Sequence, residues 1–136
     1  MAYHFSKDDW KHVREFLRKL ERESGRRWRL ADLLKEWEAF VLEVEQGYKL
    51  GIEDYTNDLA TRDLLQEIIQ SLSHEGQASL KQLIEPMDAR LLKATRPVDR
   101  PLLPPLGDES LGFWWYRIPK KAGEDLLTDL SREGFV

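Results

Sequence analysis

Apolar side chains recur every three or four residues through the first two-thirds of the chain, a spacing that places them on one face of an α-helix. Four such stretches, separated by short breaks, predict helices over residues 7–23, 30–46, 52–72 and 77–94. The second stretch has a wide apolar face, which is typical of a helix near the centre of a bundle. We therefore expect three or four antiparallel helices joined by short loops.

Capping residues set the limits of these helices. Ser6, followed three residues later by Asp9, predicts a capping box at the start of the first helix. Gly47 predicts the end of the second helix. Residues 73–76 break the apolar pattern before the fourth helix. Pro86 falls inside the fourth helix, where it should kink or split the helix because proline cannot donate the helical hydrogen bond.

The character of the chain changes after residue 96. Four prolines within nine residues predict an extended segment. A flexible linker would be more polar, so we expect this segment to lie against the bundle and to bury its apolar side chains, Val98, Leu102, Leu103 and Leu106.

A short strand is predicted over residues 112–118, where aromatic residues are bounded by glycine and proline. A lone strand leaves its backbone groups unpaired, so it needs a partner, either the proline-rich stretch or another chain. Residues 124–132 predict a short final helix. The fold expected is thus mainly α and a single domain, in which residues 1–96 form the bundle and residues 97–136 form an irregular arm that wraps over it.

Composition narrows the classes of function. The 136 residues correspond to about one domain, and the absence of cysteine excludes disulfides, zinc–thiolate sites and cysteine nucleophiles. The net charge of −4 argues against nucleic acid and anionic membranes as partners. No apolar run is long enough to span a membrane, and the first residues do not form a secretory signal, so we expect a cytoplasmic location.

The predicted strand is the first candidate surface for a protein partner. Side chains alternate between the two faces of a strand, so Trp114 and Tyr116 point outward if Phe113 and Trp115 point to the core. Exposed aromatic side chains are frequent interface anchors. The alternative is that the arm buries both faces of the strand.

The second candidate surface is the carboxylate-rich face of the second helix, which carries Glu36, Glu38, Glu43 and Glu45. An acidic surface accelerates association with a basic partner. We expect charge reversal at Glu43 and Glu45 to weaken such binding in a salt-dependent manner.

A ligand cleft is the third candidate. Asp54, Asp58 and Arg62 follow one another at intervals of four residues on the third helix, and Tyr48 and Tyr55 lie nearby in the sequence. A half-buried Arg62 needs carboxylate partners, and an anionic ligand could displace one of them. The alternative is a structural salt-bridge network at a helix crossing.

Two further patterns carry less chemistry. Residues 26–29 place three arginines around Trp28, which could grip phosphate or form a solvated loop. The three histidines lack metal-ligand spacing, and the motifs of nucleotide-binding and serine-nucleophile enzymes are missing, so we expect neither a metal nor a cofactor.

These observations favour a non-enzymatic protein-interaction module. In size, acidity and lack of cysteine the chain resembles small bacterial immunity proteins and other toxin neutralisers, which implies a toxin-neutralising form of that role. The alternative function is a small-molecule binder or enzyme with its site between the third helix and the arm. A homo-oligomer that pairs through the arm is a third hypothesis.

Overall fold

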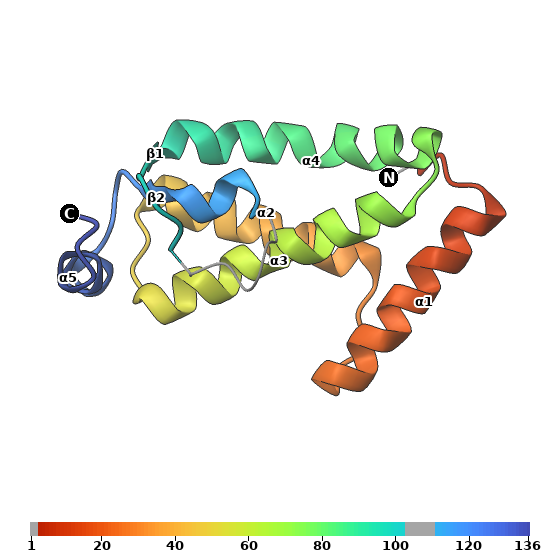
Figure 1. Ribbon diagram of the computed structural model, residues 1–136, viewed down its shortest axis with the longest axis horizontal. Helices are drawn as coiled ribbons and strands as arrows, with labels where there is room; N and C mark the ends of the chain where they lie inside the picture. Colours follow the sequence, from red (N-terminus) through yellow and green to blue (C-terminus); the bar gives the residue numbers. More distant parts are fainter. Residues whose placement is uncertain (1–2, 103–110) are drawn as a thin grey trace.

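The computed structural model describes residues 3–102 and 111–136, and it is mainly helical (Figure 1). Its elements in chain order are α1 (Lys7–Ser24), α2 (Leu30–Gln46), α3 (Ile52–Ser71), α4 (His74–Ala94), β1 (Thr95–Pro97), the 3₁₀-helix η1 (Phe113–Tyr116), β2 (Arg117–Pro119) and α5 (Glu124–Arg132). The predicted fold class is confirmed, with a helical bundle followed by an arm that contains a short strand and a short final helix. Within the described ranges, none of the helices is both long enough and apolar enough to cross a membrane.

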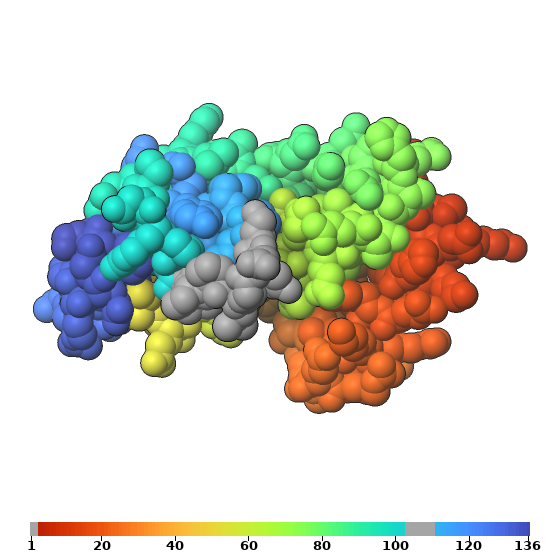
Figure 2. Space-filling model, viewed as in Figure 1, coloured from red at the N-terminus to blue at the C-terminus, as the bar shows by residue number. Residues whose placement is uncertain are grey.

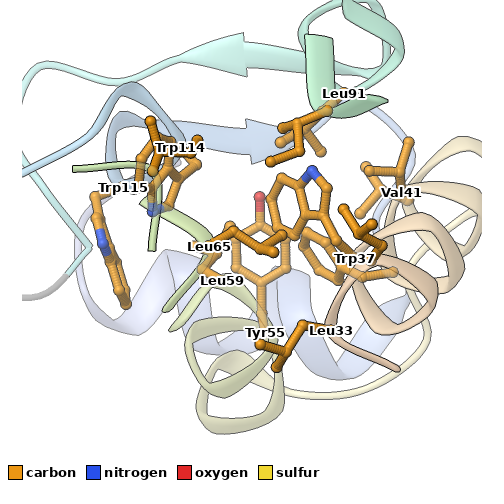
Figure 3. Close-up of a cluster of buried hydrophobic side chains, with 14 of the residues drawn as sticks. Leu33, Trp37, Val41, Tyr55, Leu59, Leu65, Leu91, Trp114 and Trp115 are labelled. Carbon is orange, nitrogen blue, oxygen red and sulfur yellow. The ribbon is translucent and has the colours of Figure 1, made fainter. Parts of the chain in front are cut away.

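The hydrophobic core lies where α2, α3 and α4 pack together, while α1 packs against α3 at one end of the molecule (Figure 1). Trp37 from α2, Tyr55 from α3 and Leu91 from α4 are completely buried and point into the same space (Figure 3). The wide apolar face of α2 is thus explained, because this helix contacts both α3 and α4.

One buried carboxylate joins the starts of α1 and α4. The predicted capping box is present, since Ser6 Oγ accepts from the Asp9 amide and Asp9 accepts from the Ser6 amide, both at 3.0 Å. Asp9 also accepts from the amide and the hydroxyl of Ser73, both at 2.8 Å. Ser73 in turn caps α4, which begins at His74, so the predicted break is present but lies at Leu72 and Ser73, and α4 begins three residues earlier than predicted. Residue 76 is a glycine at this close contact, because the Cβ atom of any other residue would lie only 2.6 Å from an Asp9 carboxylate oxygen and would clash with it.

Helix α4 continues through Pro86 without interruption, so the predicted split does not occur. Pro86 lies on the exposed side of the helix, as does Gln82 one turn earlier, whose carbonyl loses its helical donor. That carbonyl can therefore bond to water, which lowers the cost of the proline.

The strand in the arm has the kind of partner that was predicted. β2 pairs antiparallel with β1, with Arg96 opposite Ile118, so the start of the proline-rich stretch supplies the second strand. The pairing continues through a bond from the Leu102 amide to the Trp115 carbonyl at 2.9 Å. Leu102 is buried and Val98 is partly buried, as expected.

The other two apolar side chains of that stretch, Leu103 and Leu106, lie outside the described residues. The arm is fastened again at the turn between α2 and α3. There the Tyr48 amide donates to the Lys121 carbonyl at 3.0 Å, and the Gly123 amide donates to the Tyr48 carbonyl at 2.7 Å. These bonds fix the arm along the bundle.

The aromatic run does not form the predicted strand. Phe113–Tyr116 forms a 3₁₀-helix, and the strand contains only Arg117–Pro119. Successive side chains of a 3₁₀-helix are about 120° apart and do not alternate between two faces. Trp114 and Trp115 are therefore both buried, with 4% and 3% of their surface exposed, while Phe113 remains 36% exposed.

Candidate functional site

Arg62 is buried, and its partner is a carboxylate on another helix. Its Nε lies 3.2 Å from both carboxylate oxygens of Asp88 on α4, and its Nη2 lies 3.0 Å from Asp88 Oδ2. Trp37 Nε1 donates to the same carboxylate at 3.0 Å. The predicted ion-pair row of Asp54, Asp58 and Arg62 is therefore wrong, because the crossing of α3 and α4 supplies a better-placed carboxylate. The Arg62–Asp88 pair holds these two helices together inside the core.

A second carboxylate holds the arm onto α3. Asp63 Oδ1 accepts from Trp114 Nε1 at 2.9 Å, and both oxygens of Asp63 accept from Trp115 Nε1 at 3.0 Å. Burial raises the pKa of Asp63, although the two indole donors and the Arg62 charge act in the opposite direction. The Arg62 guanidinium lies 4.4 Å from the centroid of the Trp114 ring. Trp114 is thus a structural residue of this chain, and the prediction that it points outward was wrong.

A hollow of about 670 Å³ lies between α3 and the arm, at the place predicted for a ligand cleft. Arg62, Gln66, Phe113 and Trp114 are among the residues that line it. Of the four predicted cleft residues, only Arg62 lies there. The other three, Tyr48, Tyr55 and Asp58, lie elsewhere on the bundle.

The two tyrosines have different roles. Tyr55 is completely buried, and its hydroxyl donates to the Arg117 carbonyl at 2.9 Å, which links α3 to β2. The Tyr48 hydroxyl donates to Asp58 Oδ2 at 2.7 Å. Burial raises the pKa of both phenols, and at Tyr48 the bond to Asp58 adds to the effect. Both rings belong to the core, and only Tyr48 connects the core to a charged group at the surface.

Four carboxylates gather around the Tyr48–Asp58 bond. We call them the acidic cluster, and they are Glu36 and Glu43 of α2 and Asp54 and Asp58 of α3. Glu36 and Glu43 are two turns apart on one helix, and Asp54 and Asp58 are one turn apart on the next. The packing of α2 on α3 brings the two pairs together.

Burial is the largest cause of the raised pKa values in the acidic cluster, and the neighbouring like charges add to it. Partial desolvation by the packed helices, followed by the charges of Asp58 and Glu36, raises the pKa of Glu43, although the side chain remains exposed to solvent. Burial also raises the pKa of Asp58, and the charges of Asp54 and Glu36 add to this, against the hydrogen bond from Tyr48. Within the part of the chain that the structure describes, no lysine or arginine forms an ion pair with any of the four.

Glu45 does not belong to the acidic cluster, although it is only two residues from Glu43. It forms an ion pair with Arg90 of α4, whose Nε lies 3.1 Å from Glu45 Oε2. The hydrogen bond from Arg90 lowers the pKa of Glu45. The two glutamates that were predicted to act together therefore face different helices. Tyr116, the remaining predicted interface residue, is partly buried.

The acidic cluster can do limited chemistry. In residues 3–102 and 111–136, no group of three or more histidine, aspartate or glutamate side chains is arranged to hold a metal ion. The carboxylates of the acidic cluster are instead spread over the surface of two packed helices. Ionised carboxylates spread in this way can each accept a hydrogen bond from a separate donor.

Two structural carboxylates, Asp63 and Asp88, were missed in the sequence. Asp88 lies four residues after Ile84 and three before Leu91, so it falls on the apolar stripe of its helix. A carboxylate on a buried stripe needs a cationic or N–H partner, and this pattern could have identified Asp88 as the partner of Arg62. The sequence contains no comparable pattern for Asp63, because its partners depend on the course of the arm.

Neither a protein family, nor a curated protein, nor a solved structure matches the chain.

Proposed function

We propose that this protein is a non-enzymatic interaction module that binds a basic surface of a protein partner through its acidic cluster. The observation that carries this proposal is the group of four like-charged carboxylates, two of them with raised pKa values, that have no cationic partner among the described residues. Perturbed carboxylates of this kind are frequent at functional sites.

The repulsion within the acidic cluster supports this proposal. The charges lower the stability of the free protein, and a cationic partner would relieve that repulsion when it binds. The carboxylates also lie on two packed helices, and Tyr48 fixes Asp58 through a 2.7 Å hydrogen bond. Rigidly placed charges lose little conformational entropy on binding, and they steer a partner of opposite charge during the encounter.

Toxin neutralisation is the specific form of this function that we favour. A neutraliser must associate quickly and cover a functional surface of its partner. Acidic steering supplies the fast association when the partner is basic. The chain offers this surface on the bundle, at a site that does not depend on rearrangement of the arm.

Charge reversal within the acidic cluster tests the function directly. The tagged full-length protein and its Glu36→Lys/Glu43→Lys variant are used to capture partners from lysate of the source cells, and the captured proteins are identified by mass spectrometry. We expect one stoichiometric partner with a basic surface, retained by the wild type and lost by the variant. With the purified partner, calorimetry should show affinity that falls as salt rises, because screening weakens the attraction.

The matched control is Glu21→Lys/Glu23→Lys on α1. It makes the same change in net charge at two exposed positions outside the acidic cluster. We expect this control to retain the partner. A partner that binds all three proteins equally, or a preparation free of any partner, would contradict the proposal.

A second candidate function is the binding of a small molecule in the hollow between α3 and the arm. The specific observation in its favour is a space of about 670 Å³ lined by Arg62, Trp114 and the exposed ring of Phe113. Fragment screening by NMR would detect such a ligand through shifts of the Trp114 indole N–H. A library that leaves this resonance unmoved would count against it.

A further inference from the structure

Charge is distributed unevenly along the chain. Residues 7–29 contain nine lysines and arginines against five aspartates and glutamates, whereas the remaining residues contain 12 against 20. The net charge of −4 is therefore the sum of a basic first segment and an acidic remainder. Because the sum conceals this difference, it does not describe the surface that α1 presents to a polyanion.

Five cations form a straight row along α1. We call them the cationic row, and they are Lys7, Lys11, Arg14, Arg18 and Arg22. Their spacing of three or four residues places one cation on each turn, on the same side of the helix. All five are exposed. At 1.5 Å per residue, the row is about 22 Å long.

The opposite side of α1 fixes the direction in which the cationic row points. Val13 is buried, and Phe16 and Leu20 pack partly against the core. The helix lies at one end of the molecule, away from the arm and α5, and a space-filling view shows it on the outside of the bundle (Figure 2). The row therefore faces solvent along its whole length.

No cation of the row forms an ion pair within 4 Å in the described structure. Glu15 and Glu21 lie on the same helix, yet neither forms an ion pair within 4 Å. The positive charge continues beyond the helix into Arg26 and Arg27, which are also exposed. The Arg26 guanidinium lies 3.7 Å from the centroid of the Trp28 ring, which holds it at the surface.

We propose that the cationic row, with Arg26 and Arg27, is a binding site for the phosphate backbone of a nucleic acid. A regular series of charges, one per turn, suits a polymer with regularly repeated charge. Three of the five cations are arginines, whose planar fork matches phosphate oxygens. Helix α1 contains no asparagine or glutamine, the side chains that read adenine. Binding is therefore largely independent of base sequence.

Two other occupants fit the structure less well. A helix that lies on a membrane inserts apolar side chains beside its cations. The exposed large hydrophobic residues of the described structure include none from α1. A second copy of the chain would offer its acidic cluster, but Glu36 and Glu43 are about 10 Å apart along α2 and would cover only half of the row.

Fluorescence anisotropy of the full-length protein with a labelled 20-base-pair duplex tests the site. We expect binding at 50 mM salt, and phosphate contacts by the five cations of the row alone predict a slope of about −4.5 for log K against log salt. The Arg14→Gln/Arg18→Gln variant should bind about 10- to 100-fold more weakly, with the slope reduced by about 2. Glutamine preserves the helix, and circular dichroism will verify this.

The matched control is Lys93→Gln/Lys121→Gln, which removes two exposed cations outside α1. We expect its affinity for the duplex to change less than twofold. Absence of binding by the wild type at 50 mM salt, or equal loss in both variants, would overturn the proposal. Binding only to vesicles that contain phosphatidylserine, or salt-sensitive self-association without duplex binding, would overturn it in favour of a membrane or a second copy.

Discussion

Two carboxylates on α3, only five residues apart, lie in opposite surroundings. Asp63 accepts hydrogen bonds from two indole N–H groups, and Arg62 beside it adds a positive charge. Asp58 accepts one bond from Tyr48 and otherwise lies beside Asp54 and Glu36, which are acidic. Burial raises the pKa of both carboxyl groups. A raised pKa therefore does not distinguish a structural carboxylate from one that we propose binds a partner, but the neighbours of the two groups differ.

The same contrast extends to the whole molecule. The structural carboxylates, Asp9, Asp63 and Asp88, join elements far apart in sequence and have N–H or O–H donors as partners. In the described structure, the side chains of the acidic cluster connect to another element only through the hydrogen bond between Tyr48 and Asp58. Removing a structural carboxylate should therefore lower stability, whereas removing a carboxylate of the acidic cluster should not.

The largest effect is expected at Asp88. The Asp88→Ala substitution removes the carboxylate that forms an ion pair with Arg62, and Arg62 is only 6% exposed. A buried charge that loses its partner costs about 3–5 kcal/mol. Urea unfolding followed by circular dichroism will measure the loss of free energy of unfolding.

The double variant Arg62→Met/Asp88→Leu provides the control for this prediction. It removes both charges and keeps apolar volume in the core, and such replacements are often close to neutral. We expect it to recover the part of the loss that comes from the Arg62 charge, whereas Trp37 Nε1 lacks its acceptor in both variants. A double variant less stable than Asp88→Ala would show that the pair itself, rather than the orphaned charge, accounts for the loss.

Asp63 should show a smaller effect. The Asp63→Ala substitution leaves two buried indole N–H groups without acceptors, at a cost of about 2 kcal/mol. The near-ultraviolet circular dichroism of the tryptophans should weaken as the arm loosens from α3. Asp63→Asn keeps one acceptor oxygen and removes a charge whose burial is unfavourable, so its loss of stability should be smaller. Equal losses in the two variants would argue against the indole bonds.

Local rules predicted the helices well because they depend on residues close in sequence. The 3.6-residue period located four helices, and the capping box of Ser6 and Asp9 fixed the start of the first. The prediction of a strand over the aromatic residues was wrong because glycine and proline occur at the ends of strands and of 3₁₀-helices alike. Over four residues, a period of two cannot be separated from a period of three.

The candidate site could be predicted only in parts. Glu43 and Asp58 were both selected in the sequence, but for different surfaces, since only the packing of α2 on α3 brings them together. The partner of Arg62 was predicted one turn away at Asp58 and lies 26 residues away at Asp88. Contacts between distant elements depend on how the helices cross. A single sequence indicates such contacts only where a polar residue falls on the apolar stripe of a helix.

The smallest effect, at Glu43, should have the opposite sign. Its pKa is raised in the folded protein, so the ionised carboxyl lowers stability above the pKa of the unfolded chain. Glu43→Gln should therefore raise the free energy of unfolding at pH 7. The gain is about 0.5 kcal/mol at most, since Glu43 is exposed and its charge is screened. It should fade as the pH falls through about 4, because the carboxyl becomes protonated first in the folded and then in the unfolded state.

Glu38→Gln is the matched control, because it makes the same change on the exposed side of α2. The charge of Glu38 raises the pKa of Arg90, so Glu38 lies in a favourable field and its removal should give no gain. Melting temperatures at pH 7 and pH 4 will separate the two variants. If Glu43→Gln is more stable and also binds the partner more weakly, the charge that lowers stability is the one that binds. If both variants respond alike, the repulsion in the acidic cluster is too weak to support the proposed function.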